Sequence, residues 1–190
     1  MRVYVHAGPR LEHAAFLEGL KAGRTFVTNA PLLWFTVDGR EPGETIAAAG
    51  EAPLRAKVKL LSGVAVDHLE IVGDGRVIAT IPLRDGGTRA EAEITLPAPR
   101  AAWYVLRAYS DRPRLPVLDL YPFASTGPVY VQGGGSRPRA REDAAYFVTW
   151  IRRAEEKVAA HPDWNTAAEK ADTLALLARA RAEYERRAAP

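Results

Sequence analysis

Apolar side chains near the N-terminus recur at helical spacing. This spacing extends from the break at Gly8 to Gly23 and predicts one helix between two short strands, Arg2 to His6 and Thr25 to Thr28. Gly23 suits the end of this helix, because glycine adopts the left-handed conformation at no side-chain cost. We therefore expect a strand–helix–strand segment of α/β character.

From Leu32 onward the pattern changes to the period-two alternation of β-strands. The run from Leu54 to Leu60 alternates apolar and basic residues, so one face of the strand is predicted to be buried and the other exposed to solvent. Asp38-Gly39 and Asp74-Gly75 predict hairpin turns, whose central residues need positive φ. We therefore predict a mainly β chain, an immunoglobulin-like antiparallel β-sandwich with about seven strands and Trp103 as its large core aromatic residue.

The C-terminal part returns to helical spacing after a connector at Gly133 to Gly135. A first helix is broken by Pro162, and a second begins at a capping box from Thr166 to Glu169. Residues predicted on the apolar side of the first helix are Tyr146, Phe147, Trp150, Ile151 and Ala154. The predicted organisation is a strand–helix segment at 1–30, a sandwich at 31–135 and a helical hairpin at 136–190.

Charge and composition narrow the function classes. The 190 residues carry 26 Lys or Arg and 23 Asp or Glu, with a net charge of +3. Residues 1–136 have an excess of one positive charge and residues 137–190 an excess of two, so no basic stripe is formed and we expect no nucleic-acid partner. No apolar run approaches membrane-spanning length and no signal peptide is visible, so we expect no membrane partner, and localisation stays open.

Candidate catalytic groups are sparse. The absence of cysteine excludes disulfides and a Cys nucleophile, and the four histidines lack the spacing of a metal site. His68 and its neighbour Asp67 point to opposite faces of a strand, so they should not converge. His6 lies near the end of an apolar strand. It is the one histidine that we consider as a candidate to face a cavity, although we expect a surface position first. We find no catalytic and no metal-ligating residues in this sequence.

The tryptophans offer another kind of site, because exposed aromatic rings can form a platform for carbohydrate. Trp34 and Trp103 occur in strand runs, and Trp150 occurs on the apolar side of a helix, so we expect all three in cores. Trp164 follows a Pro-Asp break and is the candidate exposed aromatic residue.

Five segments together resemble the region that follows the catalytic barrel in CehA/McbA-type metallohydrolases of the PHP superfamily, named for polymerase and histidinol phosphatase domains. They are LKAGRTFVTNAPLLWFTVDG (Leu20 to Gly39), VDHLEIVGDGRVI (Val66 to Ile78), AAWYVLRAY (Ala101 to Tyr109), STGPVYV (Ser125 to Val131) and EDAAYFVTWI (Glu142 to Ile151). The resemblance covers nearly the whole chain in the same order. One departure is Ser125, where the family often has His, so any role of that His is lost.

The resemblance implies a hydrolase of phosphoesters or related esters, whose divalent metal ions are held by His, Asp and Glu in a distorted α/β barrel. Those ligand motifs precede the matched region, so no cofactor is expected in this chain, only in a parent catalytic domain. Residues 2–29 then resemble the last strand–helix–strand of the barrel. Residues of this joint are candidate interdomain contacts, namely Phe26, Thr28, Asn29 and Trp34.

Two functions remain open. The first is a non-catalytic C-terminal accessory domain, inactive alone, which braces the barrel of the same polypeptide or positions substrate. It predicts an exposed apolar surface on residues 3–27, hidden by the barrel or in a homo-oligomer. The second is a self-standing binding or assembly module for a glycan or protein, which predicts a concave site with aromatic side chains on the sandwich.

Overall fold

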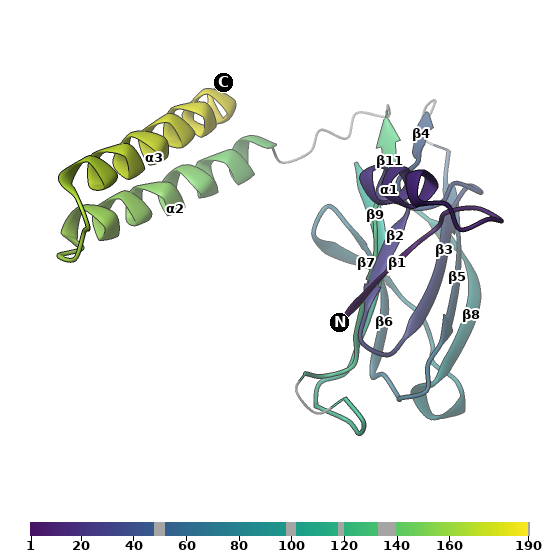
Figure 1. The fold of residues 1–190 in the computed structure, drawn as a ribbon. Helices are drawn as coiled ribbons and strands as arrows, with labels where there is room; N and C mark the ends of the chain where they lie inside the picture. Colours follow the sequence, from purple (N-terminus) through teal and green to yellow (C-terminus); the bar gives the residue numbers. More distant parts are fainter. Residues whose placement is uncertain (48–51, 98–101, 118–119, 133–139, 190) are drawn as a thin grey trace. The chain divides into compact units, whose positions relative to one another are not determined.

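The fold is mainly β, as predicted. The computed structural model describes residues 1–47, 52–97, 102–117, 120–132 and 140–189, and these contain eleven strands in two sheets and three α-helices (Figure 1). The chain separates into two compact units, Met1–Ser136 and Arg137–Pro190, which we describe one at a time. The predicted connector at Gly133 to Gly135 lies outside the described residues.

The first unit contains every strand. The elements in chain order are β1 (Arg2–Val5), α1 (His13–Lys21), β2 (Thr25–Thr28), β3 (Leu32–Val37), β4 (Thr45–Ala47), β5 (Leu54–Leu61), β6 (His68–Gly73), β7 (Arg76–Thr80), the short 3-10 helix η1 (Asp85–Gly87), β8 (Arg89–Leu96), β9 (Trp103–Tyr109), β10 (Phe123–Thr126) and β11 (Val129–Gln132). The smaller sheet has the order β3-β5-β8. The larger sheet has the order β1-β2-β10-β9-β11-β4, and β6 pairs with both β9 and β7. All pairs are antiparallel except β4 and β11, which are parallel.

One hydrophobic core receives side chains from both sheets. The predicted alternation of β5 is confirmed, because every second residue from Leu54 to Leu60 is buried. The large core aromatic is Tyr104, with 1% of its surface exposed, and not Trp103, which is half-buried. Both are aromatic neighbours in one strand, and alternation turns Tyr104, with Leu106, toward the core and Trp103 to the other face.

The N-terminal segment is built into the larger sheet. β1 and β2 are antiparallel neighbours, with Arg2 opposite Thr28, and β2 also pairs with β10. A βαβ unit requires parallel strands, so this segment extends the sheet instead of forming a separate α/β layer. The predicted role of Gly23 is confirmed, since it has φ +76° and donates to Leu20 O, while Arg24 N donates to Gly19 O.

The second unit is the predicted helical hairpin of α2 (Ala140–Ala160) and α3 (Ala167–Ala188), which lie side by side (Figure 1). Thr166 caps α3 by accepting a hydrogen bond from Glu169 N, as expected. In α2 only part of the predicted apolar side is covered: Ile151 is buried, whereas Tyr146 and Trp150 are exposed. A helix with a single partner buries a narrow stripe, so the expectation that Trp150 is a core residue was wrong.

Candidate functional site

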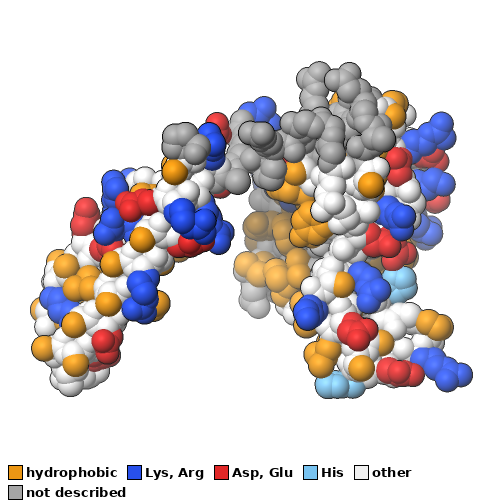
Figure 2. All heavy atoms as spheres, turned by 90° about the horizontal axis from the view of Figure 1, so that it is seen from above, with side chains coloured by type: hydrophobic (Ala, Val, Ile, Leu, Met, Phe, Trp, Pro, Cys, Tyr) orange, Lys and Arg blue, Asp and Glu red, His pale blue; other side chains and the backbone are white. Residues whose placement is uncertain are grey.

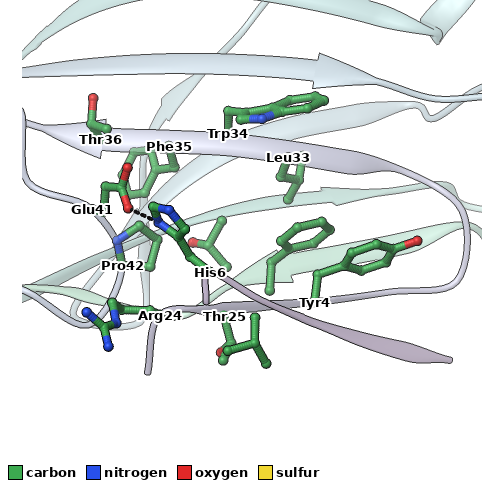
Figure 3. A pocket seen from close by; sticks show the side chains of 13 residues that line it. Tyr4, His6, Arg24, Thr25, Leu33, Trp34, Phe35, Thr36, Glu41 and Pro42 are labelled. Carbon is green, nitrogen blue, oxygen red and sulfur yellow. Dashed lines mark hydrogen bonds and ion pairs between the residues drawn. The ribbon is translucent and has the colours of Figure 1, made fainter. Parts of the chain in front are cut away.

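A groove of about 350 Å³ lies between β1 and β2 of the larger sheet and β3 of the smaller sheet (Figure 3). It opens where both sheets end in an edge strand, β1 in one and β3 in the other. Its lining is mainly apolar and comes from Tyr4, Val5, His6, Arg24, Thr25, Phe26, Leu33, Trp34, Phe35, Thr36, Glu41, Pro42 and Thr126. The volume is within the range of small-molecule sites.

Strand alternation builds the aromatic walls. Tyr4 and Phe26 are direct cross-strand partners, and their rings stack with centroids 4.8 Å apart and planes 5° apart. Leu33 and Phe35 point inward from β3 and are 4% exposed. Trp34 points to the other face of β3, is 49% exposed and forms part of the rim, so its predicted core position was wrong.

The opposite end of the groove is polar. His6 Nδ1 lies 2.6 Å from Glu41 Oε2, and Glu41 N donates to Glu44 Oε2 at 2.7 Å. Arg24 lies at the same end (Figure 3). Its Nε is buried without a hydrogen-bond partner, and its guanidinium forms no ion pair with a carboxylate of the described residues. The groove therefore presents aromatic surface at one end and an uncompensated cation at the other.

Close backbone packing positions this polar end. A Cβ atom on Gly43 would collide with Ala22 O, and one on Gly127 would collide with Gly23 O. Gly43 N donates to Pro128 O at 2.8 Å, and Gly127 N donates to Thr25 O at 2.6 Å. The end of α1, the turn before β4 and the turn before β11 therefore meet tightly, and the groove residues Arg24, Pro42 and Thr126 lie next to these contacts in the sequence.

The four candidate interdomain residues separate into two pairs. Phe26 and Trp34 line the groove. Thr28 is buried and donates through Oγ1 to Pro31 O at 2.5 Å. Asn29 donates to Tyr121 O at 2.9 Å and accepts from Phe123 N at 2.7 Å. Thr28 and Asn29 thus serve contacts inside the first unit, and the interdomain role of all four stays a prediction.

Trp164, the candidate exposed aromatic residue, is half-buried beside His161, with the ring centroids 5.9 Å apart. Its indole N–H is buried and has no partner among the residues described. Trp164 is therefore less exposed than predicted.

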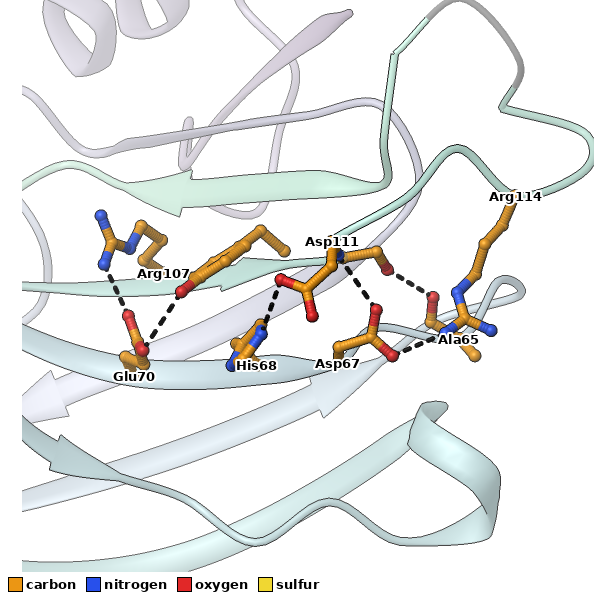
Figure 4. A network of polar contacts seen from close by, with 9 residues as sticks. Ala65, Asp67, His68, Glu70, Arg107, Asp111 and Arg114 are labelled. Atoms are coloured by element: carbon orange, nitrogen blue, oxygen red, sulfur yellow. Dashed lines mark hydrogen bonds and ion pairs between the residues drawn. The ribbon is translucent and has the colours of Figure 1, made fainter.

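A second polar cluster lies on the outer face of the larger sheet (Figure 4). Arg107 donates to Glu70 at 2.6 Å, and the Tyr109 hydroxyl donates to the same carboxylate at 3.4 Å. Glu70 is only 7% exposed. Burial of the phenol and, secondly, the negative charge of Glu70 raise the pKa of Tyr109 above its ordinary value. This arrangement keeps Tyr109 protonated as a hydrogen-bond donor.

The same cluster bears on the prediction that His68 and Asp67 would not converge. That prediction was wrong in part, because both side chains contact Asp111, and Asp67 Oδ2 accepts from Asp111 N at 3.0 Å. His68 stacks on Tyr109 and contacts Asp111 at 2.9 Å, whereas Asp67 accepts from Arg114 at 2.6 Å (Figure 4). Every carboxylate in this cluster is paired with a cation or a histidine. The cluster therefore ties the loop after β9 to β6.

The groove was only partly visible in the sequence. His6 was singled out as the histidine to watch, and it lines the groove. Tyr4 and Arg24 were not predicted, although alternation places Tyr4 and His6 on one face of β1. Glu41 was not among the predicted site residues either. The missing information was the long-range pairing that brings these residues together.

Within the described ranges, no group of three or more His, Asp or Glu side chains could hold a metal ion. None of the helices that the structure describes has the length and hydrophobicity for crossing a membrane. Figure 2 shows Lys and Arg interspersed with Asp and Glu on the helical unit. Comparisons with protein-family models, with curated proteins and with solved structures found no match.

Proposed function

We propose that this chain is a non-catalytic accessory domain of a PHP-type metal-dependent hydrolase, which packs against the catalytic barrel through β1 and α1. The observation that carries the proposal is the exposure of apolar side chains on these two elements and on the segment between them: Val3 of β1 is 51% exposed, Leu11 of the connecting segment 87%, and Leu17 and Leu20 of α1 48% and 46%. Contiguous exposed apolar side chains mark interaction surfaces.

This surface is distinct from the groove. Alternation along β1 turns Tyr4 and His6 toward the groove and Val3 toward the opposite face. Val5, at the end of the strand, also lines the groove, and a Cβ on Gly19 of α1 would collide with its Cγ1. Gly19 is the buried residue of α1, so the helix covers little of its own apolar side. Covering each square ångström of that side would contribute about 25 cal/mol.

The five segments that resemble the PHP-type enzymes supply the identity of the covering domain. A divalent metal ion would belong to that barrel, and this chain would brace the barrel or position substrate. The finer description of the first unit as an immunoglobulin-like sandwich belongs to the same proposal. It is supported by two sheets that share one core and by mostly antiparallel pairing.

The size of the native polypeptide tests the proposal. An antibody raised against this chain should detect a band well above 20.7 kDa in the source organism. The purified native protein should hydrolyse bis(4-nitrophenyl) phosphate only with added divalent metal, and this chain alone should not. A native band at 20.7 kDa would overturn the proposal.

A second candidate is a self-standing binding or assembly module for a glycan or protein. The aromatic groove supports it, because Tyr4, Phe26 and Phe35 line a concave aromatic site of the kind that this function requires. The native mass separates the two candidates, since only the second is compatible with a band at 20.7 kDa. In that case the apolar side of α1 would be covered by a second copy of the chain.

A further inference from the structure

We propose that the groove between β1, β2 and β3 binds a small amphipathic anion, an apolar ring or short apolar chain that carries one carboxylate or phosphate group. The inference depends on the groove alone and does not require the proposed barrel. It assigns the apolar part of the ligand to Tyr4, Phe26 and Phe35 and the anionic group to Arg24.

The aromatic end selects a flat apolar body. The stacked pair of Tyr4 and Phe26 forms one wall, and the inward-facing Leu33 and Phe35 lie across from it on β3 (Figure 3). Aromatic rings favour offset-stacked or edge-to-face contacts with a further ring, which add to the gain from buried area. The cavity of about 350 Å³ accommodates a ligand of one or two rings.

The other end selects a negative charge. Arginine is charged at every physiological pH, and a partly buried cation without a partner is costly. Arg24 has a buried Nε without a hydrogen-bond partner within the described part of the chain. Carboxylate and phosphate oxygens match the planar guanidinium and accept two hydrogen bonds from it. A bound anion would therefore satisfy the group that the fold leaves unpaired.

The acidic residue at this end does not compensate Arg24. Glu41 is the one carboxylate among the lining residues, and its Oε2 contacts His6 Nδ1 at 2.6 Å. The neighbouring Glu44 is engaged elsewhere, since its Oε1 lies 3.6 Å from Arg40 Nη1 and its Oε2 accepts from Glu41 N. Among the described contacts, Glu41 therefore pairs with His6 and Glu44 with Arg40, and neither pairs with Arg24.

A series of probes tests this assignment on the 190-residue chain by isothermal calorimetry and by chemical shifts of the Trp34 indole. Phenyl phosphate and benzoate should bind at least about tenfold more tightly than phenol, inorganic phosphate or acetate, since one charged hydrogen bond contributes at least that factor. The changes in chemical shift on adding these ligands should be largest for groove residues. Equal affinity for phenol and phenyl phosphate would overturn the proposal, as would binding of methyl glucoside alone.

Substitutions locate the two parts of the site. Arg24→Gln should weaken phenyl phosphate binding about tenfold and leave phenol binding unchanged, whereas Tyr4→Ala should weaken the binding of both. Arg76→Gln, on β7, is the matched control and should have no effect. The Arg24 side chain has no described partner, so Arg24→Gln should keep the wild-type circular dichroism and unfolding midpoint. The assignment would be contradicted if Arg24→Gln bound phenyl phosphate as tightly as the wild type. It would also be contradicted if the ligand changed chemical shifts of the wild-type protein mainly outside the groove.

Discussion

His6 Nδ1 and Glu41 Oε2 lie 2.6 Å apart, although the two residues are separated by 35 positions in the sequence. The contact ties the end of β1 to the turn before β4 and closes one end of the groove. The same strand turns Val3 to the opposite face, where α1 leaves apolar side chains exposed. One short edge strand thus separates a ligand-sized groove from a surface suited to another domain.

The tight glycine packing predicts a large stability loss in Gly43→Ala. Gly43 has φ +88°, and a Cβ would collide with Ala22 O. We expect a loss of about 2 to 4 kcal/mol from left-handed strain and overpacking together. Gly63→Ala is the control, because a Cβ there meets nothing within 4 Å, and it should change stability by less than about 0.5 kcal/mol. Urea unfolding measures both, and equal stabilities would refute the packing account.

Asn29→Ala should destabilise the first unit by about 1 to 3 kcal/mol. The substitution removes the donor to Tyr121 O and the acceptor for Phe123 N, and so leaves part-buried backbone groups unpaired. Asn29→Asp keeps an acceptor for Phe123 N and should cost less. The comparison variant is Asn165→Ala, at an exposed helix start, with little expected effect. If Asn29→Ala unfolds at the wild-type urea concentration, these hydrogen bonds do not stabilise the fold.

Tyr109 should titrate above its ordinary value of 10.0, because burial and then the charge of Glu70 raise its pKa. Its folded pKa exceeds the unfolded one, so the stabilisation is complete below pH 10.0 and is lost as pH rises through the folded pKa. Tyrosinate absorbance, with Tyr109→Phe subtracted, measures this titration. Glu70→Gln should bring the pKa of Tyr109 down toward its ordinary value, and an unchanged titration would exclude the influence of Glu70.

The helical hairpin should lose stability in acid. Hydrogen bonds from Arg152 and then Arg181 lower the pKa of Glu185 below its ordinary value of 4.5. Because the folded pKa is depressed, the stabilisation is present above pH 4.5 and is lost as pH falls through the folded pKa. Glu185→Gln should therefore reduce helix stability at neutral pH, as followed by circular dichroism. The difference from wild type should vanish in strong acid, and its persistence there would rule out a charge effect.

Local signals in the sequence were sufficient for much of the fold. Gly23 predicted the end of α1 because the left-handed conformation is a property of a single residue. The alternation from Leu54 to Leu60 predicted the buried face of β5. Two strands, β4 with three residues and β10 with four, were not predicted.

The candidate site depended on information that the sequence patterns lack. Trp34 was expected in the core because it is large and apolar. In a strand, however, Trp34 shares a face with Thr36 and points away from the face of Phe35, which already indicated the outer face. Arg24 looks like any surface arginine until the packing around Gly43 places it beside the aromatic walls. Its lack of a partner is a property of three-dimensional contacts, which no local pattern encodes.

Hydroxyl-radical footprinting of the native protein and of the 190-residue chain tests the central claim most directly. The proposal predicts that Leu17 and Leu20 react strongly in the isolated chain and are protected in the native protein, where the barrel covers α1. Val77, 49% exposed on β7, is the internal reference and should react equally in both. Equal reactivity of Leu17 and Leu20 in the two samples would contradict the accessory-domain account.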